Sequence, residues 1–548
     1  MTSNPLCLVS DHKNAPVNKA KQENAEFVAG ILAKHFHVSQ YLTAFHARQA
    51  RSFGAVVANK ALRRVSDSLV FDGYKSAAMD DESICNIAKV RAELCERIYH
   101  QSAGVGDTDA VRRRLEEFCE AGGVVFPLKI GKKDTPAAIS KKIVSAALRV
   151  SDAKWWRRQL RTVTGRCVES TLREIGGVCA GRSAYVSNYT LERWKKASHR
   201  NAETLKAMEA VTEIDGESVS VPLDECVASS VSNPVNRRNE LMVRMRGYEE
   251  VATGLGLTGV FLTLTCPSKY HAITHGRGLN PKYEGATPRE CMEYLNDVWA
   301  RIRAEWARSG VRCFGFRVAE PHHDGTPHFH FMLFMPADSI GRALDVFGRY
   351  AMEEDGDEPG ADKYRWDSKI IDPEKGTASG YIAKYVAKNI DGFAVDYDDE
   401  GDCHGADGAI RARAWASVWG IRQFQQIGSV SVTVYRELRR NCELFELPDS
   451  DVDDLRAAAD RGDWARFVEL MGGPLVERKG QTLRPLYQEA DQFDNAYCEP
   501  VKKMIGLWLQ VVGRAMGRSA LITRDRVWKI RRREPEDQEA AKPPNLDL

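Results

Sequence analysis

The chain has 548 residues, with a hydrophobic content of 43% and a charged content of 28%, which is typical of a soluble protein with about two to four domains. Its formal net charge of +2 gives no overall indication of a nucleic-acid partner, and no run of about eighteen apolar residues predicts a membrane span. The thirteen cysteines contain no Cys-x-x-Cys pair, which argues against a zinc ribbon or a disulfide framework and favours reduced thiols in a cytoplasm.

The N-terminal region, residues 1–230, is predicted to be mainly helical. Residues 1 to about 20 are polar, lack an apolar signal core and are expected to be disordered. Amphipathic patterns over Ala110–Cys119 and Trp155–Glu174 are each followed by a Gly-Gly pair, as expected at helix ends. Asp215–Pro222 is predicted to be a connector.

Local basic clusters are candidates for binding a nucleic-acid backbone, although a solvated helix face is the more common explanation of any single cluster. The clusters are Arg112–Arg114, Lys129 with Lys132 and Lys133, Trp155–Arg158, Arg237–Arg238, Arg439–Arg440 and Arg531–Arg533.

A helix is predicted over Asn236–Glu250, followed by a turn at Gly254–Gly259 and a strand over Phe261–Ser268. The turn matches Gly-x-Gly-x-x-Gly, but a dinucleotide site needs a strand before this motif and a helix after it, and here the order is reversed. Further helices are predicted over Cys291–Arg308 and Asp338–Met352.

Two predicted strands flank the turn-rich segment Pro321–Pro327, the first ending at Glu320 and the second beginning at His328. Because side chains alternate along a strand, His328 and His330 point to the same face of a sheet. A hairpin would return Glu320 beside them. Two imidazoles and one carboxylate can hold a metal ion and leave positions open for a substrate oxygen.

An isolated His-x-His pair more often forms hydrogen bonds inside a sheet than binds metal. The carboxylate at hairpin distance and two tyrosines downstream reverse that preference for His328 and His330. His322 and His323, in the turn, either contact a phosphate or have no role.

A helix is predicted over Tyr381–Asn389, with Thr377 and Ser379 as candidate N-caps. Tyr381 and Tyr385 are one turn apart on one face of this helix. A phenol with a pKa of ~10 is a poor nucleophile at neutral pH.

Lys384 and Lys388 lie on or beside the tyrosine face, and their charge is expected to favour the phenolate. Two ordinary tyrosines on an amphipathic helix are the alternative. Together with the metal site, Tyr381 and Tyr385 suit transesterification at a phosphodiester, in which the tyrosine stays attached to the phosphate.

In these residues the chain resembles the HUH (His-hydrophobe-His) endonucleases, and most closely the two-tyrosine replication gene A proteins of bacteriophages. Phe261–Ser268, Glu320–His330 and Tyr381–Lys388 resemble the three family motifs in order, and Trp415–Gln426 also resembles the gene A group. The resemblance is specific over about residues 235–440.

The resemblance implies a site-specific single-strand nick at a phage replication origin, a 5′-phosphotyrosine link and a free 3′-OH, which together start and terminate rolling-circle replication in the cytoplasm of a bacterial host. It implies that Glu320, His328 and His330 bind Mg²⁺ or Mn²⁺, while Tyr381 and Tyr385 attack in turn. No Gly-x-x-x-x-Gly-Lys-Ser/Thr motif occurs, so strand separation is expected from a host helicase.

The predicted fold class is α+β, with an HUH-type antiparallel sheet, packed helices, and mainly helical N- and C-terminal regions. The predicted regions are the helical region 1–230, which is a candidate DNA-binding region, the catalytic domain 231–440, a helical C-terminal region 441–530 and a flexible tail 531–548.

Three shorter predictions complete the chain. They are a final strand over Val430–Arg436, a helix over Val501–Met516 and an acidic loop over Asp396–Asp402 without a calcium site. Two rival functions stay open: an HUH relaxase or transposase, and a catalytically inactive DNA-binding regulator of the same fold.

Overall fold

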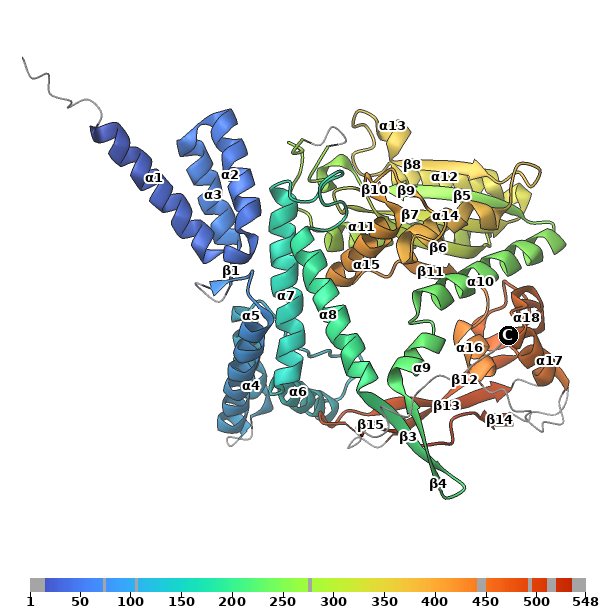
Figure 1. Ribbon diagram of the computed structural model, residues 1–548. Coiled ribbons are helices and arrows are strands. Elements are labelled where there is room, and N and C mark those ends of the chain that lie inside the picture. Colours follow the sequence, from blue (N-terminus) through green and yellow to red (C-terminus); the bar gives the residue numbers. More distant parts are fainter. Residues whose placement is uncertain are drawn as a thin grey trace, which may run out of the picture. The chain divides into compact units, whose positions relative to one another are not determined.

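The computed structural model describes residues 15–71, 75–103, 107–274, 278–440, 450–490, 495–509 and 519–534 (Figure 1). The chain divides into two compact units, Met1–Gly177 and Val178–Leu548. The domain boundaries expected at residues 230 and 440 stay predictions. Within the described ranges, no helix combines the length and apolar content needed to cross a membrane.

Unit 1 is built from helices, as the sequence predicts. They are α1 (Ala15–Lys34), η1 (Phe36–Val38), α2 (Ser39–Phe53), α3 (Ala55–Ser68), α4 (Asp81–Ala103), α5 (Thr108–Ala121), α6 (Pro136–Val150) and α7 (Ala153–Glu174), with a short strand pair of β1 (Val70–Phe71) and β2 (Lys75–Ser76). Two of them begin at aspartate N-caps, since Asp107 accepts hydrogen bonds from the amides of α5 and Asp152 accepts one from α7.

The centre of unit 2 is a five-stranded antiparallel sheet in the order β11-β6-β7-β5-β8 (Figure 1). Its strands are β5 (Thr258–Thr265), β6 (Phe314–Pro321), β7 (Pro327–Met335), β8 (Trp366–Ile370) and β11 (Phe424–Ile427). β6 and β7 form the predicted hairpin, in which Glu320 lies opposite His328. This confirms the α+β class and the antiparallel sheet.

Helices cover both faces of the sheet because its side chains alternate between two cores. Phe261, Phe316 and Met332 belong to one core, which includes residues of α10 (Pro234–Gly254) and α14 (Ala378–Ile390). The other core takes sheet residues such as Phe329 and Phe331, together with three further helices. Those helices are α11 (Pro288–Arg308), α12 (Ile340–Ala351) and α15 (Gly405–Trp419).

The remaining described elements complete unit 2. They are α8 (Asn188–Lys206), β3 (Met208–Ile214), β4 (Glu217–Pro222), α9 (Leu223–Ser229), η2 (Ser268–Tyr270), η3 (Ala337–Ser339), α13 (Ala361–Tyr364), β9 (Tyr397–Asp398), β10 (Cys403–His404), α16 (Val432–Arg440), α17 (Ser450–Asp460), α18 (Trp464–Leu470), η4 (Arg478–Gly480), β12 (Leu483–Ala490), β13 (Val501–Leu509), β14 (Ser519–Ile522) and β15 (Lys529–Arg532).

The expected helix over Val501–Met516 is wrong in its described part, because Val501–Leu509 is strand β13 between β12 and β14. Gly506 explains the difference: a Cβ there would lie 1.9 Å from the carbonyl oxygen of Leu521, so only glycine lets the neighbouring strand approach. Residues 510–516 lie outside the described residues. In its described residues, the C-terminal region is therefore not mainly helical, because the strands β12 to β15 follow the helices α17 and α18.

Two smaller expectations also change. Val430–Arg436 is not a strand, since helix α16 begins at Val432 and buries Val434. The expected connector Asp215–Pro222 is the turn and second strand of a β-hairpin.

Of the segments expected to be disordered or flexible, residues 1–14 and 535–548 lie outside the described residues. Helix α1 already begins at Ala15, and Arg531 and Arg532 belong to β15, which pairs with β3.

Candidate functional site

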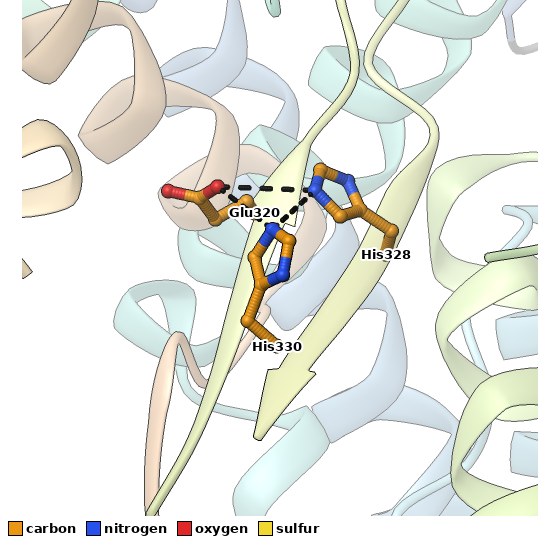
Figure 2. Close-up of side chains that lie close together, drawn as sticks. All are labelled: Glu320, His328 and His330. Atoms are coloured by element: carbon orange, nitrogen blue, oxygen red, sulfur yellow. Dashed lines mark hydrogen bonds and ion pairs between the residues drawn. The ribbon is translucent and has the colours of Figure 1, made fainter. Parts of the chain in front are cut away.

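Glu320, His328 and His330 converge on one face of the β6–β7 hairpin, as predicted (Figure 2). The Nε2 atoms of the two histidines are 2.9 Å apart, and Glu320 Oε2 lies 3.3 Å from His330 Nε2 and 3.8 Å from His328 Nε2. All three side chains are buried. Three ligand atoms of the kinds that bind divalent metals therefore point at one spot.

The surroundings of the two imidazoles suit metal binding. Burial, together with the charges of neighbouring histidines, lowers the pKa of His328 well below its ordinary value, so this ring is neutral near pH 7. Thr263 Oγ1 lies 3.1 Å from His330 Nδ1. When this hydroxyl accepts from Nδ1, Nε2 keeps the lone pair that a metal ligand needs.

Glu320 is kept ionised inside the protein. Burial alone would raise the pKa of this carboxyl, but hydrogen bonding with His330 and the charge of Lys388 outweigh burial and lower it. Asn389 donates to Glu320 Oε1, and Gln423 Nε2 donates to Asn389 Oδ1 at 3.1 Å. The carboxylate thus keeps Oε2 for the histidines.

These residues fit a divalent cation. Neutral imidazole nitrogens and a carboxylate oxygen are ordinary ligands for such ions. Without a cation, the two Nε2 atoms face each other and Glu320 Oε2 across a short gap, and His328 Nδ1 is buried without a hydrogen-bond partner. The metal-binding roles of Glu320, His328 and His330 stay predictions.

Helix α14 carries both predicted tyrosines and packs against the site. Thr377 is its N-cap and accepts from the amide of Gly380, as one of the two candidates predicted. Glu249 of α10 adds a second cap by accepting from the amides of Ala378 (2.7 Å) and Ser379 (3.1 Å). These bonds and the buried apolar stripe fix the face that α14 turns to the sheet. That stripe consists of Ile382, Val386 and Ile390.

Tyr385 lies against the candidate metal ligands. Its ring centroid is 4.2 Å from that of His330, and Phe261 stacks on both rings at 5.3 and 5.4 Å. Phe261 therefore holds the phenol beside the imidazole. The half-buried position leaves the Tyr385 side chain partly open to solvent.

Tyr381 lies one turn further from the ligands and has a different neighbour. Its ring centroid is 6.0 Å from that of Phe261, and Lys369 Nζ of β8 lies 4.4 Å from the centroid of the Tyr381 ring. Lys369 carried no prediction, because only the sheet brings it beside α14.

The charge of Lys388 favours the Tyr385 phenolate, as expected, but it does not decide the direction of the pKa shift. Burial, followed by the charge of Glu320, raises the pKa of Tyr385, and the opposing charge of Lys388 does not reverse that direction. Lys384 is exposed to solvent. In the absence of a cation the Tyr385 phenol is therefore protonated at neutral pH.

Lys388 belongs to a buried network. Its Nζ lies 3.1 Å from Asp398 Oδ1, and Tyr185 Oη donates to Asp398 Oδ2 at 2.6 Å. Burial alone would lower the pKa of Lys388, but the carboxylates of Glu320 and Asp398 raise it. The ammonium thus links Glu320 to a loop that the sequence marked only as acidic.

The same acidic loop reaches the turn of the hairpin. Glu400 Oε1 lies 3.3 Å from His322 Nδ1 and accepts from the amide of His323 at 2.9 Å. The His322 ring stacks on His328 with centroids 4.0 Å apart. A phosphate contact by either turn histidine stays a prediction.

The structure is that of an α+β protein, with a candidate metal site on an antiparallel sheet and a helix that carries two tyrosines packed against it. Comparison with known sequences gives the family. A sequence profile described as bacteriophage replication gene A protein (GPA) matches residues 77–393. The chain belongs to this family.

Individual relatives support the same family. The chain is 38% identical to the replication gene A protein of Escherichia phage 186 over 82% of this chain and 66% of that protein. It is 36% identical to the replication gene A protein of Escherichia phage P2 over 74% of this chain and 54% of that protein. It thus spans about half to two thirds of the length of these two relatives.

A third relative is covered more fully. A probable replication endonuclease from a prophage-like region of Salmonella paratyphi A is 34% identical over 97% of this chain and 72% of that protein. No solved structure matches this chain.

Proposed function

We propose that this chain is a DNA nicking and joining enzyme that starts and terminates rolling-circle replication of a phage genome. The observation that carries the proposal is the Tyr385 ring, 4.2 Å from the ring of His330, which is one of three converging candidate ligands. A nucleophile beside a cation site is the arrangement that phosphoryl transfer requires. Membership of the replication gene A family supports the DNA substrate.

Glu320, His328 and His330 would hold Mg²⁺ or Mn²⁺. The bound ion would neutralise charge on the scissile phosphate and make phosphorus easier to attack. Asn389 supports this role because it occupies the second oxygen of Glu320 and thereby orients the carboxylate.

In the proposed reaction the phenolic oxygen of Tyr385 attacks phosphorus. A tyrosine O–P bond forms while the bond between phosphorus and the 3′ oxygen breaks. The phenol loses one proton and the 3′ oxygen gains one, so the step is balanced without water. Lys388, at the back of the site, would offset the negative charge of Glu320 and of the phosphate.

Tyr381 would make the second cut after one round of synthesis. The 3′-OH released by that cut would attack the first phosphotyrosine and close a circle. The position of Tyr381 one helical turn from Tyr385 supports this alternation, since both phenols lie on the face of α14 that packs against Phe261. The partners would be origin DNA, single-stranded or supercoiled, and a host helicase.

The proposal is tested by incubating the protein with Mg²⁺ and a supercoiled plasmid that carries the phage origin. We expect relaxed circles with covalently bound protein, and mass spectrometry of the DNA-linked peptide should find Tyr381 or Tyr385. The double variant Tyr381→Phe and Tyr385→Phe should bind DNA and form no covalent product. Nicking by the double variant would refute the assignment of the nucleophiles.

The same assay separates the rival functions. Cleavage only at a conjugative transfer origin or a transposon end would identify a relaxase or transposase. Binding without cleavage in Mg²⁺ or Mn²⁺ would identify a catalytically inactive regulator.

A further inference from the structure

Two adjoining hollows lie beside strand β12, and their lining comes from separate parts of unit 2. The first has a volume of about 600 Å³ and is bounded by the end of α11, the turn between β11 and α16, and the segment before β12. The second, of about 450 Å³, shares Arg478 and Pro485 with the first and extends to Trp508 of β13. Together they form one open groove, which we call the β12 groove.

The β12 groove is basic. Its basic lining residues are Arg303, Arg312, Arg478, Lys479 and Arg484. No Asp or Glu belongs to the described lining of either hollow. Lys479 is paired with Glu477 at 2.9 Å, and Arg312 donates to the carbonyl of Leu475 at 2.6 Å, so these two are partly engaged. The charge suits a polyanion.

Aromatic side chains accompany the basic ones. Tyr487 lines the first hollow and is 49% exposed, which leaves its ring available for stacking. Trp508 lines the second hollow and lies opposite Arg484 in the β12–β13 pair. Basic residues interleaved with aromatic rings bind single-stranded nucleic acid, because phosphates meet the cations while bases stack on the rings.

A buried polar atom points to a ligand with a hydrogen-bond donor. Gln481 lines the first hollow and is 4% exposed, yet its Oε1 has no hydrogen-bond partner. Ser429, in the same lining, has a positive φ of 64°, and its carbonyl oxygen accepts from Gln481 Nε2 at 3.5 Å, so within the Gln481 amide it is the oxygen that lacks a partner. An unsatisfied buried acceptor is unfavourable unless a ligand supplies the donor. The amino group of a base is such a donor.

We propose that the β12 groove binds a single-stranded segment of the DNA substrate several nucleotides from the cleaved bond. The groove begins at the start of β6, and Glu320 lies near the end of the same strand, roughly 20 Å away at about 3.3 Å per residue. This inference rests on the proposed function, since it places a second part of the same substrate. The guanidinium groups bind phosphates, Tyr487 stacks on a base and Gln481 accepts from its amino group.

Binding is measured in the full chain with Tyr381→Phe and Tyr385→Phe as background, so that chemistry does not contribute. Fluorescence anisotropy with a labelled oligonucleotide of about 20 nucleotides gives the affinity between about 50 and 200 mM salt. Adding Arg478→Ala and Arg484→Ala should weaken binding and reduce the slope of log affinity against log salt by about 1.4, at about 0.7 per lost phosphate contact.

The aromatic contact is tested separately in the same background. Tyr487→Ala should weaken binding about tenfold without changing the salt slope, whereas Tyr487→Phe should retain the affinity. The exposed Arg461, outside the groove, provides the charge control, and Arg461→Ala should leave the slope unchanged. The proposal would be overturned if the arginine variant kept the affinity and the salt slope of the background protein and Tyr487→Ala kept its affinity.

A competition arm distinguishes a DNA strand from a free nucleotide. Unlabelled oligonucleotide should displace the probe, whereas dAMP at the same nucleotide concentration should not. Displacement by dAMP alone would assign the groove to mononucleotides and overturn the strand assignment. DNA binding is measured here without cleavage. If the protein bound DNA through the β12 groove but never nicked it, the proposed function would be refuted, while the assignment of the groove to DNA binding would stand.

Discussion

At the scale of single residues, Tyr381 and Tyr385 differ in their surroundings although they lie on one face of α14. Tyr385 stacks near His330, and its pKa is raised by burial and by Glu320. Tyr381 instead lies under the ammonium of Lys369. In the proposed reaction, Tyr385 would depend on the candidate cation site for activation, whereas Tyr381 would have the ammonium of Lys369 beside its ring.

The first prediction follows from this difference. Tyr385→Phe should reduce the first cleavage of an origin oligonucleotide more than about a hundredfold, because removal of a nucleophile leaves only positioning effects. Tyr381→Phe should retain that cleavage and lose strand transfer to a second oligonucleotide. Covalent adducts on denaturing gels measure both steps. Equal losses of the first cleavage in the two variants would contradict the division of roles.

The second prediction concerns Asn389, which donates to the carboxylate of Glu320 and to the carbonyl oxygen of Tyr385. Asn389→Ala should weaken Mn²⁺ binding about 10- to 100-fold, as is usual when the partner of a ligand is lost. Isothermal titration calorimetry measures the affinity. Lys384→Ala, at an exposed position of the same helix, is the control and should bind Mn²⁺ normally. Unchanged affinity in Asn389→Ala would show that Glu320 needs no support.

At the scale of elements, β6 depends on one glycine for its pairing with β7. Gly315 has a φ of +151°, and a Cβ there would lie 2.0 Å from the carbonyl oxygen of Met332. Gly315→Ala should destabilise unit 2 by roughly 3 kcal/mol, measured by urea unfolding, because backbone in the sheet would have to move. Gly341→Ala is the control: apart from its chain neighbours and the backbone of its own helix, no described atom lies within 4 Å of the added Cβ, so stability should not fall.

Local patterns in the sequence were sufficient to predict the β6–β7 hairpin and helix α14. The alternation at His328 and His330 and the turn-rich segment before them define the register, which brings Glu320 back beside the histidines. The spacing of Tyr381 and Tyr385 likewise defines one helix face. Short-range periodicity carries this information because neighbours along the chain make the contacts.

Contacts between distant segments could not be predicted in this way. Asn389 reads as an ordinary residue near a helix end, and only the packing of α14 on β6 brings it to Glu320. Asp398 reads as part of an acidic loop, yet it is buried against Lys388. The apolar spacing of Val501–Leu509 fits a helix as well as a strand, and the partners of β13, β12 and β14, are separate segments, so the local pattern does not decide between the two. The Asp215-Gly216 turn, by contrast, is a local hairpin signal.

At the scale of the whole molecule, the chain has two compact units, and the stability of each unit can be measured separately. In unit 1, His35 is fully buried, with Ser76 Oγ at 2.8 Å from Nδ1 and Ser66 Oγ at 3.0 Å from Nε2. Burial, assisted by the charge of Lys34, lowers the pKa of His35 to about 4. The neutral imidazole is therefore the form that fits the folded unit.

The pH dependence of unit 1 follows from this shift. Between about pH 6.5 and pH 4 the unfolded chain protonates His35 and the folded unit does not, so the stability of unit 1 falls as the pH falls through this window. The loss should reach about 3 kcal/mol at about 1.4 kcal/mol per pH unit. Hydrogen exchange of amides in unit 1 measures it in the full chain.

Two matched variants separate the contribution of His35 to the pH dependence from the contribution of the Asp and Glu carboxylates of unit 1. His35→Gln should remove about 3 kcal/mol of the pH dependence, while His46→Gln, at a partly exposed histidine of the same unit, should keep it. The same pH profile in His35→Gln and the parent protein would contradict the assignment.

The two hydrogen bonds of Asn389 Nδ2 connect the carboxylate of Glu320, a proposed metal ligand, to the backbone carbonyl of Tyr385, a proposed nucleophile. If Glu320 binds an ion, a shift of its carboxylate would be transmitted through Asn389 to helix α14. By thermodynamic reciprocity, if ion binding strengthened the binding of DNA against α14 by some factor, bound DNA would strengthen ion binding by the same factor. Cleavage would then require a bound ion, and the tyrosines of the ion-free protein would not cut host DNA.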